Sequence, residues 1–286
     1  RVELRAANKC HPILEGGLQV KGGNNAELIL NGIMVCRRTL DISEVKNLSL
    51  RHCTLVPGTT SLRLNLKSDK SATGVEINHS IISSLRISSE RSTLNVQDSI
   101  IHSMDSNTPA IAGIKKDKPG PSTTLERATI IGTIYVKELK ASNVIFTGSI
   151  ASDMQQTGCI RFSYIPPGSQ TPRSYRCQPD LAVQKKLEEE LEKKTGLTPE
   201  EIKLKKIIEE EITLRLKPVF TDLHYGNPGY CQLLLQCPVE ISQGADDGAE
   251  MGVFHDLFQP QRETNLQVRL NEYLRFGLEA GIFYVR

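Results

Sequence analysis

The sequence has 286 residues, of which 5% are aromatic and none is Trp, so stacked Ile, Leu and Val side chains must supply most of its core. Its 35 Lys and Arg residues against 33 Asp and Glu residues leave a formal charge of +2, too balanced for the diffuse basic surface that binds nucleic acid. No apolar run reaches the roughly 18 to 20 residues that span a bilayer.

Cysteine usage and the first residues bear on where the protein folds. The chain begins at Arg1, without an initiator Met or a signal segment, inside the strand-like VELRAA. We therefore expect a piece of a longer protein, whose upstream part would hold any targeting signal. The seven cysteines are scattered and contain no CxxC, which disfavours a zinc cage or a secreted disulfide framework. We expect mostly buried thiols in a reducing compartment, with a bridge between Cys231 and Cys237 as the alternative.

A short pattern recurs along the first half of the chain. It consists of an aliphatic residue, two or three spacers, a Ser, Thr or Asn, and two large apolar residues. The copies are LILNGIMV (28–35, degenerate), LRHCTLV (50–56), INHSII (77–82), VQDSII (96–101), LERATII (125–131) and LKASNVIF (139–146). Most copies precede a second alternating segment such as SLRLNL or TIYV, so the unit predicted is a pair of short strands.

The spacing of the copies favours a β-solenoid. The intervals are 26, 19, 30 and 14 residues between anchors at Thr54, Ser80, Ser99, Thr129 and Asn143. Period-two alternation with inserts of variable length is typical of strands stacked coil upon coil, with surplus residues expelled as loops such as residues 104–123. We therefore predict a right-handed parallel β-helix of about five to six coils over residues 1–178. A twisted β-sandwich is the alternative, because it also consists of short strands.

The paired aliphatic residues follow from this architecture. A coil of about 20 residues cannot bury an apolar face alone, so its inward side chains must stack on those of the neighbouring coils. In SII, one Ile points inward while its neighbour turns a corner or packs on an outer loop. We assign Ile100 to the core and Ile101 to the corner. The small polar residue before them is expected in the corner, bonded to backbone groups or to its counterpart in the next coil.

Residues 179–217 predict an inserted α-helical hairpin. Its first helix has apolar residues four apart, at Val183, Leu187 and Leu191, and Gly196 is a natural stop. The second helix starts at Thr198, where TPEE supplies an N-cap, a Pro at the first helical position and a Glu that closes a capping box. Its mostly apolar face comprises Ile202, Lys205, Ile208 and Ile212. The hairpin is either a docking element for a partner or a solvated insertion, and we favour the insertion.

The last segment, residues 218–286, mixes loops with one helix near residues 261–274 and a strand-like GIFYV at 281–285. We expect it to form a C-terminal α/β segment that caps or flanks the solenoid. An open solenoid end would otherwise expose unpaired strand edges.

One tail segment, GADDGAEMG, offers oxygen ligands for a cation through Asp246, Asp247 and Glu250. Its spacing does not match an EF-hand loop, which needs alternate ligands and a bidentate Glu at position twelve. We favour a turn followed by a helix N-terminus, where carboxylates interact well with the helix dipole. We therefore predict no metal site and no cofactor.

The evidence for a catalytic site is as weak as the evidence for a cation site. The six histidines form no HExxH pair, and the chain contains no GxSxG, Walker loop or GxGxxG. His52 and His79 occupy similar repeat positions, which predicts a column of outward side chains. Asp98 and Glu126 could act as the two acids of a glycoside hydrolase, but no aromatic platform accompanies them. We predict no catalytic residues, and we interpret Asp98 as an outward structural side chain.

Several longer segments are distinctive: GCIRFSYIPPGSQTPRSYRCQPD, YGNPGYCQLLLQCP, GADDGAEMGVFH and NEYLRFGLEAGIFYV. With LRHCTLVPG and ASNVIFTG, they resemble an uncharacterised family of large bacterial right-handed β-helix proteins, associated with loci similar to contractile phage tails and injection systems. The resemblance covers most of the chain except the hairpin, which looks like an insertion. It carries over no catalytic residues.

This resemblance implies a non-enzymatic structural component of a phage-tail-like contractile injection particle, at its baseplate or as a peripheral fibre. The partners implied are other protein subunits of the assembly, or copies of the chain itself. The protein would fold in the bacterial cytoplasm and act in a particle that is released or anchored at the envelope. The alternatives are a carbohydrate-binding or carbohydrate-active β-helix, such as a polysaccharide lyase or hydrolase, and a surface adhesin.

Overall fold

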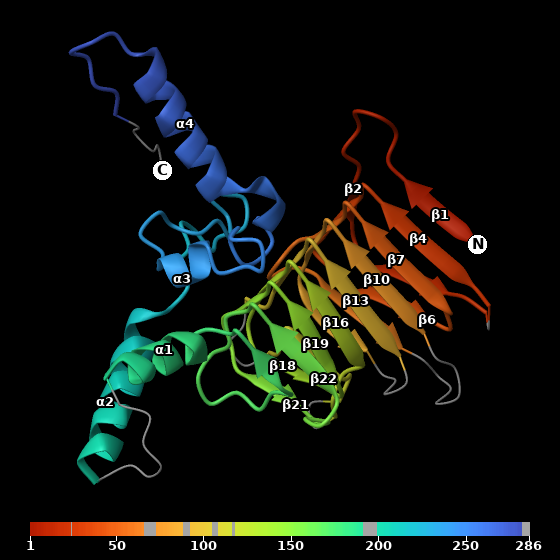
Figure 1. Cartoon of the computed structure of the whole chain (residues 1–286). Coiled ribbons are helices and arrows are strands. Elements are labelled where there is room, and N and C mark those ends of the chain that lie inside the picture. The colour runs from red at the N-terminus through yellow and green to blue at the C-terminus, as the bar shows by residue number, and fades with distance from the viewer. Residues whose placement is uncertain are drawn as a thin grey trace.

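The computed structural model describes residues 1–23, 25–65, 73–87, 92–104, 108–115, 118–190 and 199–281. Its first part is a parallel β-helix, followed by two packed helices and a loop-rich tail (Figure 1). The strands form three sheets in which the pairs given by the described residues run parallel. The predicted mainly β solenoid is therefore confirmed, and the β-sandwich is excluded.

Each of the three sheets takes one strand from every complete coil, and β22 and β23 extend sheet A alone. Sheet A comprises β1 (Val2–Arg5), β4 (Glu27–Asn31), β7 (Asn47–Arg51), β10 (Gly74–Asn78), β13 (Thr93–Gln97), β16 (Ser122–Glu126), β19 (Leu139–Ser142), β22 (Gly158–Arg161) and β23 (Ser174–Tyr175). Sheet B comprises β2 (Ile13–Glu15), β5 (Met34–Cys36), β8 (Thr54–Leu55), β11 (Ile81–Ile82), β14 (Ile100–His102), β17 (Thr129–Ile131) and β20 (Ile145–Phe146). Sheet C comprises β3 (Leu18–Lys21), β6 (Leu40–Ser43), β9 (Ser61–Asn65), β12 (Ser84–Ile87), β15 (Ile111–Ala112), β18 (Ile134–Val136) and β21 (Ile150–Ser152).

The described strands make seven complete three-strand coils, more than the five to six expected. The additional coil is the first one, formed by β1, β2 and β3. Residues 6–12 separate β1 from β2, whereas only residues 79 and 80 separate β10 from β11. The longer corner breaks the spacing of the repeat, so the first coil carries no recognisable copy.

Each coil turns from sheet A to sheet B at a residue in the left-handed backbone region. This corner column comprises Gly32, His52, His79, Asp98, Arg127, Asn143, Phe162 and Arg176, with φ values from 46° to 72°. Only Gly and, to a lesser degree, Asn and Asp adopt this conformation at low energy. Contacts between coils must therefore hold the other residues in place.

Small polar residues directly after the corner column supply these contacts. The hydroxyl of Ser80 donates to Asn78 O at 2.7 Å and accepts from the backbone N–H of Cys53, at 3.0 Å, in the preceding coil. The hydroxyl of Ser99 accepts from the N–H of Ser80 at 3.0 Å. The predicted corner role is confirmed for these two serines.

Three of the five anchors are misaligned, however. Thr54 and Thr129 pair with Ile81 and Ile100, one position after the serines, and Asn143 belongs to the corner column, one position before them. The equivalent positions hold Cys53, Ala128 and Val144. The sequence pattern could not show this shift, because Cys and Ala replace Ser there without any change in strand period.

The core and corner assignments of Ile100 and Ile101 are reversed. Ile101 stacks with Ile82 and Ile130 inside the solenoid and is fully buried. Ile100 points outward and packs against the tail. Because strand side chains alternate with period two, a difference of one residue exchanges the two faces of sheet B.

After the last coil come α1 (Asp180–Glu190) and α2 (Pro199–Arg215), which form the predicted hairpin. Ile208, Ile212 and Leu216 pack against Ala182, Val183 and Leu187, whereas Ile202 is exposed. The expected roles of Leu191, Gly196 and Thr198 lie outside the described residues.

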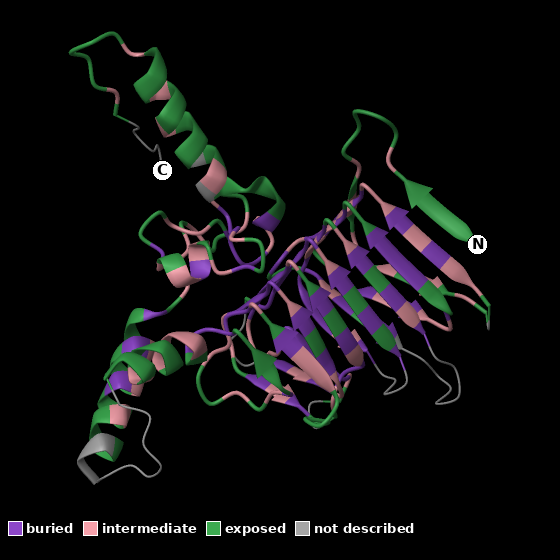
Figure 2. Ribbon diagram, in the orientation of Figure 1, coloured by how far each residue is buried: buried purple, intermediate pink, exposed green. Residues whose placement is uncertain are grey.

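The tail contains α3 (Val239–Ser242), the 3-10 helix η1 (His255–Leu257) and α4 (Gln259–Tyr273), the last close to the predicted helix. It packs on the flank of sheet B, and α4 projects from the body (Figures 1 and 2). The strand expected at the end of the chain falls on residues 282–285, outside the described part.

Two smaller points complete the fold. All seven cysteines are free thiols, so the alternative of a bridge between Cys231 and Cys237 is wrong. Among the helices of the described ranges, none has the length and apolar character needed to cross a membrane.

Replacing Ile101 with Ala should lower the free energy of unfolding by about 2–5 kcal/mol, because it leaves a cavity between stacked coils. The matched change Ile13→Ala, at a side chain of the first coil that is 55% exposed, should stay within about 0.5 kcal/mol of the parent. Urea unfolding followed by circular dichroism measures both, and equal effects would contradict the assignment of the inner face.

Candidate functional site

In its later coils, sheet B carries large apolar side chains on its outer face, and the tail packs against them. Ile100 and Ile131 pack with Tyr230 and Cys231. In a second cluster, Ile145 packs with Tyr164, Cys237, Ile241 and Met251. This seam joins segments about 100 residues apart in sequence and places the tail beside the corner column.

Hydrogen bonds fix the tail along the seam. His102 Nδ1 lies 2.8 Å from the hydroxyl of Tyr230, and both side chains are buried. Burial lowers the pKa of His102 and raises the pKa of Tyr230, so both groups are neutral near pH 7. One coil further on, Thr129 Oγ1 accepts from the backbone N–H of Val253 at 3.1 Å.

The predicted histidine column is present and continues into charged residues. The exposed rings of His52 and His79 lie 5.2 Å apart between centroids. His79 Nε2 lies 3.9 Å from Asp98 Oδ2. Asp98 accepts two hydrogen bonds from Arg127, at 2.6 Å from Nε and 3.0 Å from Nη2.

Arg127 gathers three carboxylates. Besides Asp98, it contacts Glu126 at 2.6 Å and Asp256, from the tail, at 3.6 Å. The hydrogen bonds to Asp98 raise the pKa of Arg127. The two acids considered for glycoside hydrolysis, Asp98 and Glu126, thus share one guanidinium, and Asp98 is only 8% exposed. This geometry supports the structural interpretation of Asp98.

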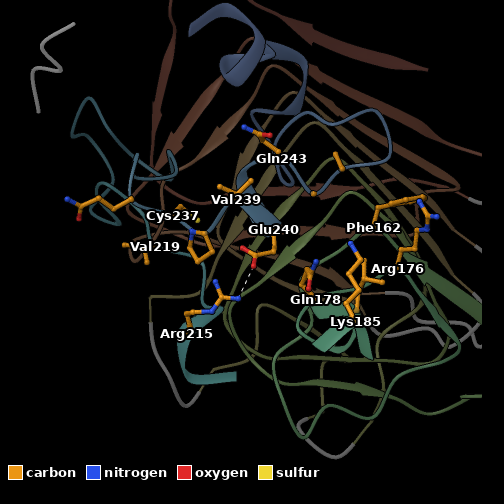
Figure 3. Close-up of a pocket in the computed structure, with 15 residues that line it drawn as sticks. Phe162, Arg176, Gln178, Lys185, Arg215, Val219, Cys237, Val239, Glu240 and Gln243 are labelled. Atoms are coloured by element: carbon orange, nitrogen blue, oxygen red, sulfur yellow. Dashed lines mark hydrogen bonds and ion pairs between the residues drawn. The ribbon is translucent and has the colours of Figure 1, made fainter. Parts of the chain in front are cut away.

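A cavity of about 920 Å³ lies where the last coil, the hairpin and α3 meet (Figure 3). Arg176 and Lys185 line it, and Arg215 donates to Glu240 across it at 2.8 Å. Gln178 also lines it, with a buried Oε1 that has no hydrogen-bond partner. Sequence reasoning missed this cavity because its wall combines several distant segments, none of which carries a motif.

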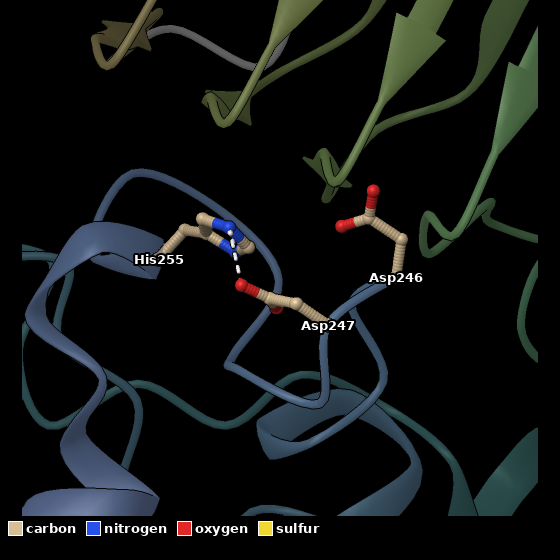
Figure 4. A group of neighbouring side chains, drawn as sticks. All are labelled: Asp246, Asp247 and His255. Carbon is tan, nitrogen blue, oxygen red and sulfur yellow. Dashed lines mark ion pairs between the residues drawn. The ribbon is translucent and has the colours of Figure 1, made fainter.

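The tail segment considered, and not favoured, as a cation site brings together a different set of side chains from Asp246, Asp247 and Glu250. Asp246 and Asp247 are joined by His255, and one potential ligand atom of each lies within 4.8 Å of the others (Figure 4). Glu250 is not a member of this group. The expected turn is present, closed by a hydrogen bond from Gly248 N–H to Ala245 O. The helix expected directly after it is absent: the next helical element is η1, which begins only at His255.

Glu250 has a separate role beneath this turn. Its side chain is buried, and burial raises the pKa of its carboxyl to about 7. Its backbone carbonyl accepts a hydrogen bond from His255 Nδ1 at 3.2 Å. The only sequence signal for His255 was its place in the distinctive segment GADDGAEMGVFH.

Comparison with known proteins adds no relative: no family model, no curated protein and no solved structure matches the chain. The functional conclusions therefore rest on the geometry of the chain itself.

The pair Asp98–Arg127 should be strongly coupled. Arg127→Gln should cost about 3 kcal/mol of unfolding free energy, because it leaves the buried Asp98 carboxylate without its guanidinium partner. Asp98→Asn should cost less, because Arg127 keeps its ion pairs with Glu126 and Asp256. A double-mutant cycle should show a coupling energy above about 1 kcal/mol. The exposed pair Arg37–Glu15, at 3.4 Å, is the control and should show a coupling below that value. Equal coupling in the two pairs would contradict the structural role of Asp98.

Glu250→Gln should remove a pH-dependent loss of stability. The folded-state pKa of about 7 lies above the value of about 4.3 expected in an unfolded chain, so stability is lost as pH rises through this window. At pH 8 the loss from this group is on the order of 3 kcal/mol. Urea titrations at pH 5 and pH 8, in EDTA, should show the variant gaining on the parent at pH 8. A difference that does not change with pH would contradict the burial of this carboxyl.

Proposed function

We propose that the chain is a non-enzymatic structural component of a large protein assembly, in which α4 docks into an apolar groove of another subunit. The observation that carries this proposal is the surface of α4. Leu266, Leu270 and Tyr273 recur at the spacing of one helix face, and Phe276 continues the apolar surface beyond the helix. None of these four side chains is buried.

The chemistry of this helix favours a protein partner. The helix itself projects away from the β-helix and is mostly exposed, so its apolar side chains cannot contribute to the solenoid core (Figure 2). Burial of such a stripe in a groove is a common mode of helix recognition, with anchors at positions i, i+4 and i+7. Large exposed apolar side chains gathered on one face are typical of surfaces that associate.

The β-helix suits the same role. Its continuous aliphatic core makes a stiff body, and stacked coils present long surfaces for docking. Within the chain, Arg127 holds Asp98 of the corner column and the neighbouring Glu126 in ion pairs, which fits a role of these two acids in stability. We propose a phage-tail-like contractile particle as this assembly, because the tail segments resemble those of bacterial β-helix proteins associated with injection-system loci.

Particles purified from the native host should contain this chain, as measured by mass spectrometry. Leu266→Glu should reduce its incorporation about tenfold or more, because the groove would have to bury a charge. Leu214→Glu, the same change at an exposed position of the hairpin, should leave incorporation unchanged. Absence of the parent chain from the particles would overturn the proposed assembly. A loss only in Leu214→Glu would show that docking depends on the hairpin and not on α4.

A glycan array and a polysaccharide-cleavage assay address the carbohydrate alternatives. Under the proposal, the parent chain neither retains nor cleaves a glycan. Specific retention that is lost in Arg176→Ala, at the rim of the 920 Å³ cavity, would favour the carbohydrate-binding alternative.

A further inference from the structure

The geometry points to a binding site for a divalent transition-metal ion of the Zn²⁺ type, formed by Asp246, Asp247 and His255, which fastens the tail to the β-helix. One potential ligand atom from each residue lies within 4.8 Å of the others. In Figure 4 the imidazole and the two carboxylates gather beside the ends of the solenoid strands. His255 is buried while both acids are exposed, so an ion would enter from solvent.

Each of the three side chains is oriented by a hydrogen bond to a group outside the proposed ligand set. His255 Nδ1 lies 3.2 Å from the carbonyl of Glu250. A carbonyl only accepts, so Nδ1 carries a proton in this contact, which leaves Nε2 as the ring nitrogen that can bind an ion. Asp247 Oδ1 accepts from the N–H of Ala249 at 2.9 Å, and Asp246 Oδ1 accepts from Asn143 Nδ2 at 2.8 Å. Such outer partners are the usual means of fixing metal ligands in proteins.

Two side-chain atoms that take no part in these hydrogen bonds lie close together. His255 Nε2 lies 3.4 Å from Asp247 Oδ2. An imidazole lone pair and a carboxylate oxygen repel at this distance unless a proton or a metal ion lies between them. Two ligands of a tetrahedral zinc ion, with bonds of about 2.1 Å, lie about 3.4 Å apart. A proton on Nε2 would satisfy Asp247 alone, whereas a metal ion also uses the second carboxylate, from Asp246.

The donor set selects the class of ion. Calcium and magnesium prefer all-oxygen sites, whereas an imidazole nitrogen with carboxylate oxygens suits zinc and its neighbours in the first transition row. Three protein ligands leave room for water as a further ligand.

The position of the site explains its structural effect. Asn143, in the corner column of the β-helix, donates to Asp246 Oδ1 and accepts from the Asp246 backbone N–H at 3.2 Å. An ion bound to Asp246 and to the buried His255 would therefore tie both ends of residues 246–255 to one corner of the solenoid.

Isothermal titration of the EDTA-treated chain with ZnCl₂ tests the site. The parent should bind one ion with a rise in melting temperature. Asp247→Asn should weaken binding about 100-fold, and Asn143→Gly, which keeps the left-handed corner, should weaken it about tenfold. His224→Gln is the control, because it removes an exposed tail imidazole 3.0 Å from Asp222. It should bind zinc as the parent does.

Titration with CoCl₂ identifies the ligands, since the spectrum should show d–d bands without a thiolate charge-transfer band. A thiolate band, or loss of binding in His224→Gln, would place the ion elsewhere and overturn the proposal. Equal zinc binding by the parent and Asp247→Asn, or none by either, would also overturn it and leave an imidazolium–carboxylate pair at this position.

Discussion

The rest of the structure depends on one constraint: in its later coils, sheet B carries large apolar side chains on both faces. Ile101 and its equivalents point inward and are buried by the stacking of coils. Ile100, Ile131 and Ile145 point outward, and stacking cannot bury them. Exposed strands of this kind would invite aggregation, so the outer face needs a cover. The tail supplies it, and this explains why a loop-rich segment with little regular structure is nevertheless well packed.

The polar features of the seam follow from this packing. The corner column lies next to the covered face, and each of its residues directly follows a strand of sheet A, from β4 onward. When the tail lies on sheet B, its own polar groups meet that column: Asp256 contacts Arg127, and Asp246 exchanges two hydrogen bonds with Asn143. The left-handed corners thus serve both as turns of the solenoid and as attachment points for the tail.

Some functional groups are already paired inside the chain, and others are exposed and available to a partner. Arg127 holds Asp98 of the corner column and the neighbouring Glu126, while the apolar stripe of α4 has no cover within the described part of the chain. The proposed structural role in an assembly fits both observations. A hydrolase would instead need an acid able to exchange a proton with its substrate.

The sequence alone determined the solenoid, the hairpin, the tail helix and the column of His52 and His79, because strand and helix periods are local properties of the chain. It could not determine which Ile of each pair faces the core, since a shift of one residue exchanges the faces without changing the pattern. It also could not bring His102 to Tyr230, or Asp246 to Asn143, across more than 100 residues. Only the packing of the tail on sheet B decided those contacts, because the side chains that meet there belong to segments whose relative position no local pattern encodes.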